Sequence, residues 1–301
     1  AGLFLVLLGV FRLGTIIKFI PYPIVVGFTS GIAVTIFTTQ VKDLFALQMD
    51  AVPAEFVEKW IAYGKNFLTL DPATTIVGIL SIIIIALTPR FSKKVPGSLV
   101  AIILATVAVY FLNMFEITKI ETIGDRFGEI KAALPEITAL SIFEGGVTWS
   151  MINTLIPTAI TIAVLGAIES LLSATVADGV TGHHHDSNQE LVGQGIANIV
   201  TPFFGGIPAT GAIARTMTNI NNGGRTCISG IIHALVLLVI FILLMPLASY
   251  IPMSCLAGVL VVVSYNMSGW RTFRELMSNP KSDVSVLIIT FLLTVIFDQI
   301  G

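Results

Sequence analysis

The sequence contains few charged residues. Asp, Glu, Lys and Arg make up 11% of its 301 residues, whereas a typical soluble domain has about 25%. Hydrophobic residues make up 55%, which excludes a disordered chain and a water-soluble globular one. The net charge of −2 provides no basic excess to neutralise nucleic acid phosphates. The composition therefore predicts an integral membrane protein whose main surroundings are the lipid bilayer, with no nucleic acid partner.

Metal-binding patterns are also scarce. The two cysteines, Cys227 and Cys255, do not have metal-ligand spacing, and there is no H-E-x-x-H motif. The three histidines at 183–185 are contiguous, so they lack the spacing of one helical turn that two ligands on one helix need. We expect these histidines to lie in a solvated loop, and we expect no metal and no other cofactor.

Long apolar runs indicate membrane-spanning helices. Nine runs approach the length needed to cross a bilayer, and a shorter one, Gly211–Ile220, lies between two of them. The nine are Gly2–Ile17, Ile24–Val41, Thr74–Thr88, Ser98–Met114, Met151–Ala174, Leu191–Phe204, Ile228–Pro246, Met253–Tyr265 and Val284–Phe297. Several are short, as in transporters with broken helices. The sequence therefore predicts an all-α, multi-pass membrane protein.

The connecting loops differ in charge. Lys and Arg gather in Pro89–Lys94, Ser268–Ser282 and the turn at Arg225, whereas Asp and Glu gather in Lys42–Asp71 and Phe115–Trp149. By the positive-inside rule the first group is expected in the cytoplasm and the second outside, in agreement with the alternation of the spans. Within the second group, Pro135–Glu144 is expected to form an interfacial helix.

Glu169 lies near the middle of an apolar run. A central acidic residue costs roughly 2.5–3.5 kcal/mol to insert, so it must pair, contact water, bind a cation or take up a proton. Ser173 follows one helical turn later and shares its helix face. A carboxylate and a hydroxyl so placed can hold a small cation or a proton; a structural hydrogen bond between helices is the alternative.

The segment 203–219 combines a helix break with a helix start. Gly205, Gly206 and Pro208 end the preceding helix, and a new helix is expected to begin near Gly211 or Ala212. Its first turn exposes free N–H groups and the positive end of the helix dipole, a suitable place for an anion. The site residues expected here are Gly211, Ala212, Ile213, Ala214 and Arg215. The small side chains let an anion approach the amides and Arg215 adds positive charge; a kinked helix with Arg215 reaching the membrane interface is the alternative.

Several motifs resemble one known family. They are GVFRLG at 9–14, FIPYPIVVGFTSGIA at 19–33, DSNQELVGQGIANI at 186–199, GGIPATGAIART at 205–216 and NNGGRT at 221–226. They are collinear, cover almost the whole chain and are similar to the corresponding motifs of the sulfate permease (SulP) family of anion transporters.

The resemblance implies a fold of fourteen segments in two inverted seven-segment repeats, which form a core and a gate domain. Residues 1–301 are then expected to hold segments four to thirteen, without the first three segments, the last one and the cytoplasmic STAS domain. In the family the anion lies between the third and the tenth half-helix, and only the tenth is expected here. The piece alone is therefore not expected to transport, and the full-length protein is expected to form a homodimer.

The resemblance also assigns roles to individual residues. Glu169 matches the acidic position on the eighth segment that is linked to proton or sodium coupling, and Ser173 stands where bicarbonate transporters of the family have Thr. Gly211, Ala212 and Ile213 match the start of the tenth helix, and Arg215 its basic residue. Sodium-coupled members have Thr at the position of Ile213, so Ile213 favours protons over sodium.

These observations lead to one expectation and several alternatives. We expect a secondary active transporter of small inorganic anions in the plasma (inner) membrane, with sulfate as the default substrate and proton coupling through Glu169. The alternatives on the same scaffold are sodium-coupled transport or exchange of bicarbonate, chloride or dicarboxylate, a nucleobase permease, and an anion channel or voltage-driven motor. We do not expect the protein to be an enzyme. An intramembrane hydrolase would need a nucleophile or metal ligands facing Glu169, and only Ser170 and Ser173 are near it in sequence.

Overall fold

The computed structural model describes residues 1–17, 21–49, 52–91, 95–128, 148–221 and 223–296, with only the backbone at position 214. Their secondary structure is helical apart from one isolated antiparallel bridge between Thr122 and Pro252. Six of these described helices are long and apolar enough to cross a membrane. The prediction of an all-α membrane protein is thereby confirmed. The expected interfacial helix Pro135–Glu144 lies outside the described residues.

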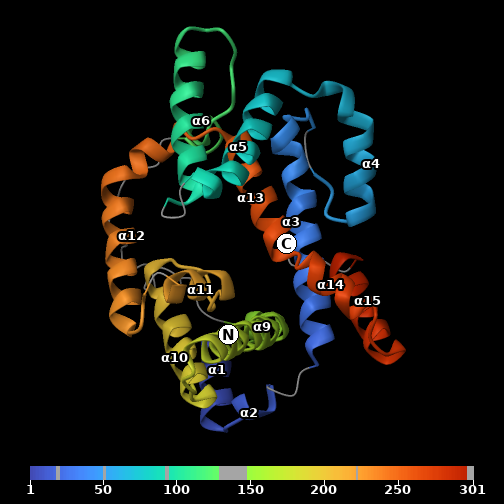
Figure 1. Cartoon of the computed structure of the whole chain (residues 1–301), viewed down its shortest axis with the longest axis vertical. Helices are drawn as coiled ribbons and strands as arrows, with labels where there is room; N and C mark the ends of the chain where they lie inside the picture. The colour runs from blue at the N-terminus through green and yellow to red at the C-terminus, as the bar shows by residue number, and fades with distance from the viewer. Residues whose placement is uncertain (18–20, 50–51, 92–94, 129–147, 222, 297–301) are drawn as a thin grey trace. The chain divides into compact units, whose positions relative to one another are not determined.

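The chain divides into two compact units, here called unit 1 (residues 1–20 and 132–243) and unit 2 (residues 21–131 and 244–301). Unit 1 contains α1 (Gly2–Val10), α2 (Gly14–Ile17), α9 (Trp149–Thr181), α10 (Ser187–Val200), η2 (Thr201–Phe204) and α11 (Ile213–Asn221) (Figure 1). Helix α12 (Cys227–Ala248) begins in unit 1 and ends in unit 2. The first expected span, Gly2–Ile17, is interrupted between α1 and α2, where Arg12 adopts a φ of 57°.

Small residues let α1 and α10 pack backbone to backbone. A Cβ atom on Gly9 would lie 2.6 Å from the Asn188 carbonyl oxygen, and one on Gly195 would lie 2.8 Å from the Gly2 carbonyl oxygen. Such close approach at small residues is the usual way in which helices associate in membranes. The buried hydrophobic cluster of unit 1 joins α1 and α10 to α9 and consists of Leu5, Ala163, Ala167, Leu171 and Leu191.

Unit 2 is built around one long helix, α3 (Tyr22–Phe45), which packs against α5, α13 and α15. Its other elements are α4 (Phe56–Asn66), η1 (Phe67–Thr69), α5 (Pro72–Phe91), α6 (Gly97–Met114), α7 (Ile123–Phe127), α13 (Met253–Met267), α14 (Trp270–Leu276) and α15 (Lys281–Ile296). The Ser264 hydroxyl donates to the Ala33 carbonyl at 2.7 Å. Hydrogen bonds of this kind join helices where apolar burial alone cannot.

The segment between α6 and α7 is fixed to the start of α13 by backbone hydrogen bonds. The Ile123 N–H donates to the Ile251 carbonyl at 2.9 Å, and the Met253 N–H donates to the Glu121 carbonyl at 3.0 Å. Thr122 and Asp125 form a capping box at the start of α7, and the hydrogen bonds from Thr122 lower the pKa of the Asp125 carboxyl. These bonds hold α7 in a defined place within unit 2.

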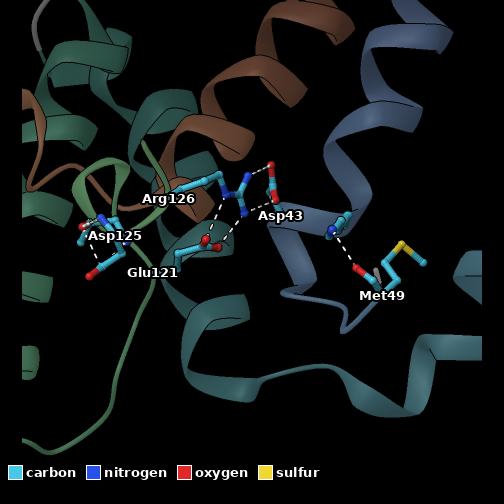
Figure 2. Close-up of polar contacts among 7 residues, drawn as sticks. Asp43, Met49, Glu121, Asp125 and Arg126 are labelled. Carbon is cyan, nitrogen blue, oxygen red and sulfur yellow. Dashed lines mark hydrogen bonds and ion pairs between the residues drawn. The ribbon is translucent and has the colours of Figure 1, made fainter. Parts of the chain in front are cut away.

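An ion-pair network fastens α7 to α3. Both terminal nitrogens of Arg126 donate to the Asp43 carboxylate, at 2.8 and 3.0 Å, and Arg126 also pairs with Glu121 (Figure 2). The two carboxylates hold the pKa of the Arg126 guanidinium above its ordinary value. Bidentate pairing of this kind gives geometric specificity that a simple surface ion pair lacks.

Replacement of Arg126 by Gln is expected to destabilise the protein by about 1–2 kcal/mol, because it removes a network rather than a single exposed pair. Thermal unfolding in detergent at low and high salt is the measurement. The destabilisation should shrink as salt rises, because salt screens partly exposed charges. Lys119→Gln, which removes the same charge from an exposed side chain in the segment before α7, is the control. Equal effects of the two variants would contradict a stabilising role for the network.

Candidate functional site

The candidate site begins with a break in the helical structure of unit 1. Residues 205–212 form no helix, so 203–221 is not one continuous helix. The break that the sequence predicts is therefore present. Gly205 adopts a φ of 72° at the turn, a left-handed conformation that glycine adopts without steric cost. The next residue, Gly206, approaches Thr201 so closely that a Cβ atom would collide with it. The two glycines therefore let the chain leave η2 sharply and run extended toward α11.

Helix α11 begins at Ile213, slightly later than the expected Gly211 or Ala212. Its first intrahelical hydrogen bond runs from the Thr216 N–H to the Ala212 carbonyl at 3.0 Å. The Gly211 N–H donates instead to the Ser170 hydroxyl of α9 at 3.2 Å. The residues before Ile213 are thus held to a neighbouring helix in extended form, which delays the start of α11.

Hydroxyl groups bind the extended segment and α11 to α9. The Thr210 hydroxyl donates to the Gly166 carbonyl at 3.0 Å and lies 2.9 Å from the Ser170 hydroxyl. One turn further along α9, the Ser173 hydroxyl lies 2.8 Å from the Thr216 hydroxyl. Three α9 residues, Gly166, Ser170 and Ser173, therefore mark the face of α9 on which α11 packs.

The first turn of α11 has uncommitted hydrogen-bond donors. The N–H groups of Ala212, Ile213 and Arg215 have no acceptor within the part of the chain that the structure describes. Ala212, Ile213 and Arg215 are exposed, and no described carboxylate pairs with Arg215. A helix start of this kind attracts anions through its N–H groups and its dipole. The side chain of the remaining predicted residue, Ala214, is not described.

Glu169 is half-buried on α9, and its carboxylate has no partner among the described residues. It lies one turn from Ser173 on the same helix face, and Ser173 contacts α11. The Ser173 hydroxyl itself bonds to Thr216 of α11, and the predicted joint binding of a small cation or a proton by Glu169 and Ser173 stays a prediction. Glu169 is thus an unpaired carboxylate at the side of α9 that meets α11.

Sequence reasoning missed the residues that fix this geometry. Thr210 and Thr216 are ordinary polar residues in the sequence, and Asn198 falls inside a run read as a membrane span. The amide of Asn198 is itself a signal in the sequence, because a buried amide in a membrane helix must find hydrogen-bond partners.

The histidine loop is more ordered than a solvated loop requires. His183 and His184 are exposed. Both ring nitrogens of His185 form hydrogen bonds: Nδ1 lies 2.7 Å from the Asp178 carboxylate, and Nε2 lies 2.9 Å from the Ser187 hydroxyl. Ser187 is 3% exposed, so these contacts join the end of α9 to the start of α10. This loop follows the C-terminal end of α9, beyond Ser173, and none of the described hydrogen bonds that hold the start of α11 involves it.

Comparisons with known proteins agree with this architecture. The profile of the Sulfate permease family matches residues 1–290. The chain is 42% identical over its whole length to the putative sulfate transporter YvdB of Bacillus subtilis, of which it covers 55%. It is 32% identical, again over its whole length, to the bicarbonate transporter BicA of Picosynechococcus, of which it covers 51%. The chain thus spans about half the length of these curated relatives.

Solved structures show the same fold. The transmembrane domain of a cyanobacterium bicarbonate transporter BicA superposes with a TM-score of 0.83 at 31% identity, covering 99% of this chain and 73% of that one. Murine Slc26a9, an anion transporter solved in the inward-facing state, superposes with a TM-score of 0.84 at 19% identity, covering 98% of this chain and 48% of that one. These relatives are named transporters, not enzymes. The chain belongs to the sulfate permease family.

Proposed function

We propose that the full-length protein is a secondary active transporter of small inorganic anions in the plasma membrane, carrying sulfate by default, with protons as the coupling ion. The observation that supports this most directly is the start of α11, where free N–H groups and an unpaired Arg215 are exposed together. Irregular backbone at membrane depth is tolerated only where it is buried in protein or lines a water-filled cavity. Unit 1 carries all of these residues and fits the core domain of the family.

The unpaired carboxylate of Glu169 supports coupling to protons. Moving one uncompensated charge across the membrane costs about 2.3 kcal/mol per 100 mV. An anion that crosses together with a proton on Glu169 carries less net charge, so the combined step costs less. Ile213 at the start of α11 supplies no side-chain oxygen for a sodium ion, which favours protons.

The substrate assignment rests on similarity. The putative sulfate transporter of Bacillus subtilis is more similar to this chain than the bicarbonate transporter of Picosynechococcus, at 42% against 32% identity. Sodium-coupled bicarbonate transport is the second candidate, because a BicA transmembrane domain shares the fold of this chain at 31% identity. A site built from backbone N–H groups does not by itself discriminate between these anions.

Uptake of labelled sulfate by proteoliposomes containing the full-length protein tests the proposal. Wild-type uptake should increase when the outside is made acidic, and Glu169→Gln should remove that increase, because a neutral amide cannot take up the coupling proton. Glu275→Gln, which neutralises an exposed carboxylate on α14, is the control and should behave as wild type. Unchanged uptake and pH dependence in Glu169→Gln would remove Glu169 from the mechanism, and competition by bicarbonate under a sodium gradient would favour the second candidate.

A further inference from the structure

Asn198 connects α10 to the extended segment that precedes α11. Its amide nitrogen donates to the Ala209 carbonyl at 2.8 Å, and its amide oxygen accepts from the Ala209 N–H at 2.8 Å. The same nitrogen donates to the Gln194 carbonyl at 2.9 Å. Asn198 is 8% exposed, so this side chain makes these three bonds away from water, where an unmade bond is costly.

This contact lies in the chain directly before the start of α11, so it can affect where the candidate site lies. Ala209 is held by α10, whereas the next two residues, Thr210 and Gly211, are held by α9. Two helices thus fix three consecutive residues from two directions, directly before the turn that exposes the anion-binding N–H groups. Without the contact at Ala209, the residues directly before α11 would keep only their bonds to α9.

We infer that Asn198 is a positioning residue, which sets the location of the α11 N-terminus through the Ala209 backbone without touching the anion itself. This inference rests on the proposed transport function for its consequence, but the contact itself is independent of it. An asparagine is suited to this task because one planar amide offers a donor and an acceptor to the same backbone residue. Substitution should therefore change how well the anion binds more than how well the protein folds.

Unit 2 contains the same kind of contact between residues that do not belong to the candidate site, which provides a matched control. The Asn113 amide donates to the Ile120 carbonyl at 3.0 Å and accepts from the Ile120 N–H at 2.9 Å. Ile120 is fully buried. Both asparagines thus use one side chain to bind both backbone groups of an extended residue further along the chain.

Asn→Asp at each position is the sharpest test. A carboxylate keeps the acceptor but places negative charge beside a carbonyl oxygen, whereas a protonated carboxyl regains one donor. At neutral pH, Asn198→Asp should raise the sulfate concentration for half-maximal uptake about tenfold, equivalent to one or two lost hydrogen bonds. When each uptake rate is divided by the wild-type rate at the same pH, the relative rate of Asn198→Asp should rise toward one as the pH is lowered. Asn113→Asp should lower thermal stability without changing half-saturation.

A neutral variant covers the case in which a buried carboxylate prevents folding. The side chain of Asn198→Ser is too short to bridge both backbone groups of Ala209, so it should raise the half-saturation concentration as Asn198→Asp does, without recovery in acid. Asn113→Ser is its control. The inference is overturned if the substitutions at 198 and 113 change half-saturation equally, or if neither changes it.

Hydrogen exchange separates this inference from the transport proposal. Amides in the peptide covering residues 205–212 should exchange faster in the Asn198 variants than in wild type, and those variants should leave the peptide around Ile120 unchanged. This measurement needs no transported anion. A wild-type protein that carries no anion would refute the proposed function alone, whereas unchanged exchange at 205–212 in Asn198→Ser would refute the positioning role alone.

Discussion

Replacing Gly211 with Leu is expected to abolish most anion transport, whereas replacing it with Ala should leave transport near wild type. A Cβ atom at position 211 would lie 3.5 Å from the Ser170 Cα and 3.7 Å from the Ser173 Cβ, which is ordinary van der Waals contact. The larger side chain of Leu can point either toward α9 or away from it. Against α9 they push α11 away and break the bond from the Gly211 N–H to Ser170; away from α9 they occupy the space in front of the free N–H groups.

Both outcomes reduce anion binding, so the expected loss in uptake does not depend on which one occurs. The loss should be at least about tenfold, the equivalent of 1.4 kcal/mol, because a hydrogen bond and access to the N–H groups are affected together. Initial rates of sulfate uptake by the full-length protein, normalised to the amount of folded protein in the membrane, provide the measurement. Wild-type rates in Gly211→Leu would mean that the anion does not approach the start of α11.

The break before α11 could be predicted from sequence because it depends on local chemistry. Gly205 and Pro208 disfavour helix within a few residues of themselves, whatever the rest of the chain does. The unusual character of Glu169 was equally accessible, since the cost of a carboxylate in an apolar span follows from the span alone. Local signals therefore identified both parts of the candidate site.

The contacts that connect those parts could not be predicted, because they join residues far apart in the chain. The one-turn spacing of Glu169 and Ser173 is visible in the sequence, but the bond of Ser173 to Thr216, 43 residues away, is not. The exact start of α11 depends on the bond between the Gly211 N–H and Ser170, which exists only because α9 and α11 pack together. Such bonds follow from the packing of helices and not from the sequence of either one.

The packing of α1 against α10 illustrates the same dependence on a larger scale. Gly193 and Gly195 are both glycines of α10, two residues apart, and the sequence does not distinguish them. In the structure a Cβ atom on Gly193 would meet nothing within 4 Å, whereas one on Gly195 would lie 2.6 Å from the Val6 backbone nitrogen. Of these two glycines, Gly195 is therefore the one that the close approach of the two helices requires.

Gly195→Ala is expected to destabilise the protein, and Gly193→Ala to leave it unchanged or slightly more stable. The first forces α1 and α10 apart, since the obstructing atoms include backbone that cannot rotate away; overpacking of this kind costs about 1–3 kcal/mol. The second gains about 1 kcal/mol of helix propensity without any collision. Thermal unfolding of both variants in the same detergent gives the comparison.

The consequence should extend to transport, because α10 also carries Asn198, one turn beyond Gly195. A displaced α10 moves the amide that holds Ala209, so Gly195→Ala should weaken sulfate uptake as well as stability, although position 195 lies outside the candidate site. Gly193→Ala should weaken neither. If Gly195→Ala lowered the unfolding temperature but kept the wild-type half-saturation concentration, α10 would support the fold without setting the position of α11.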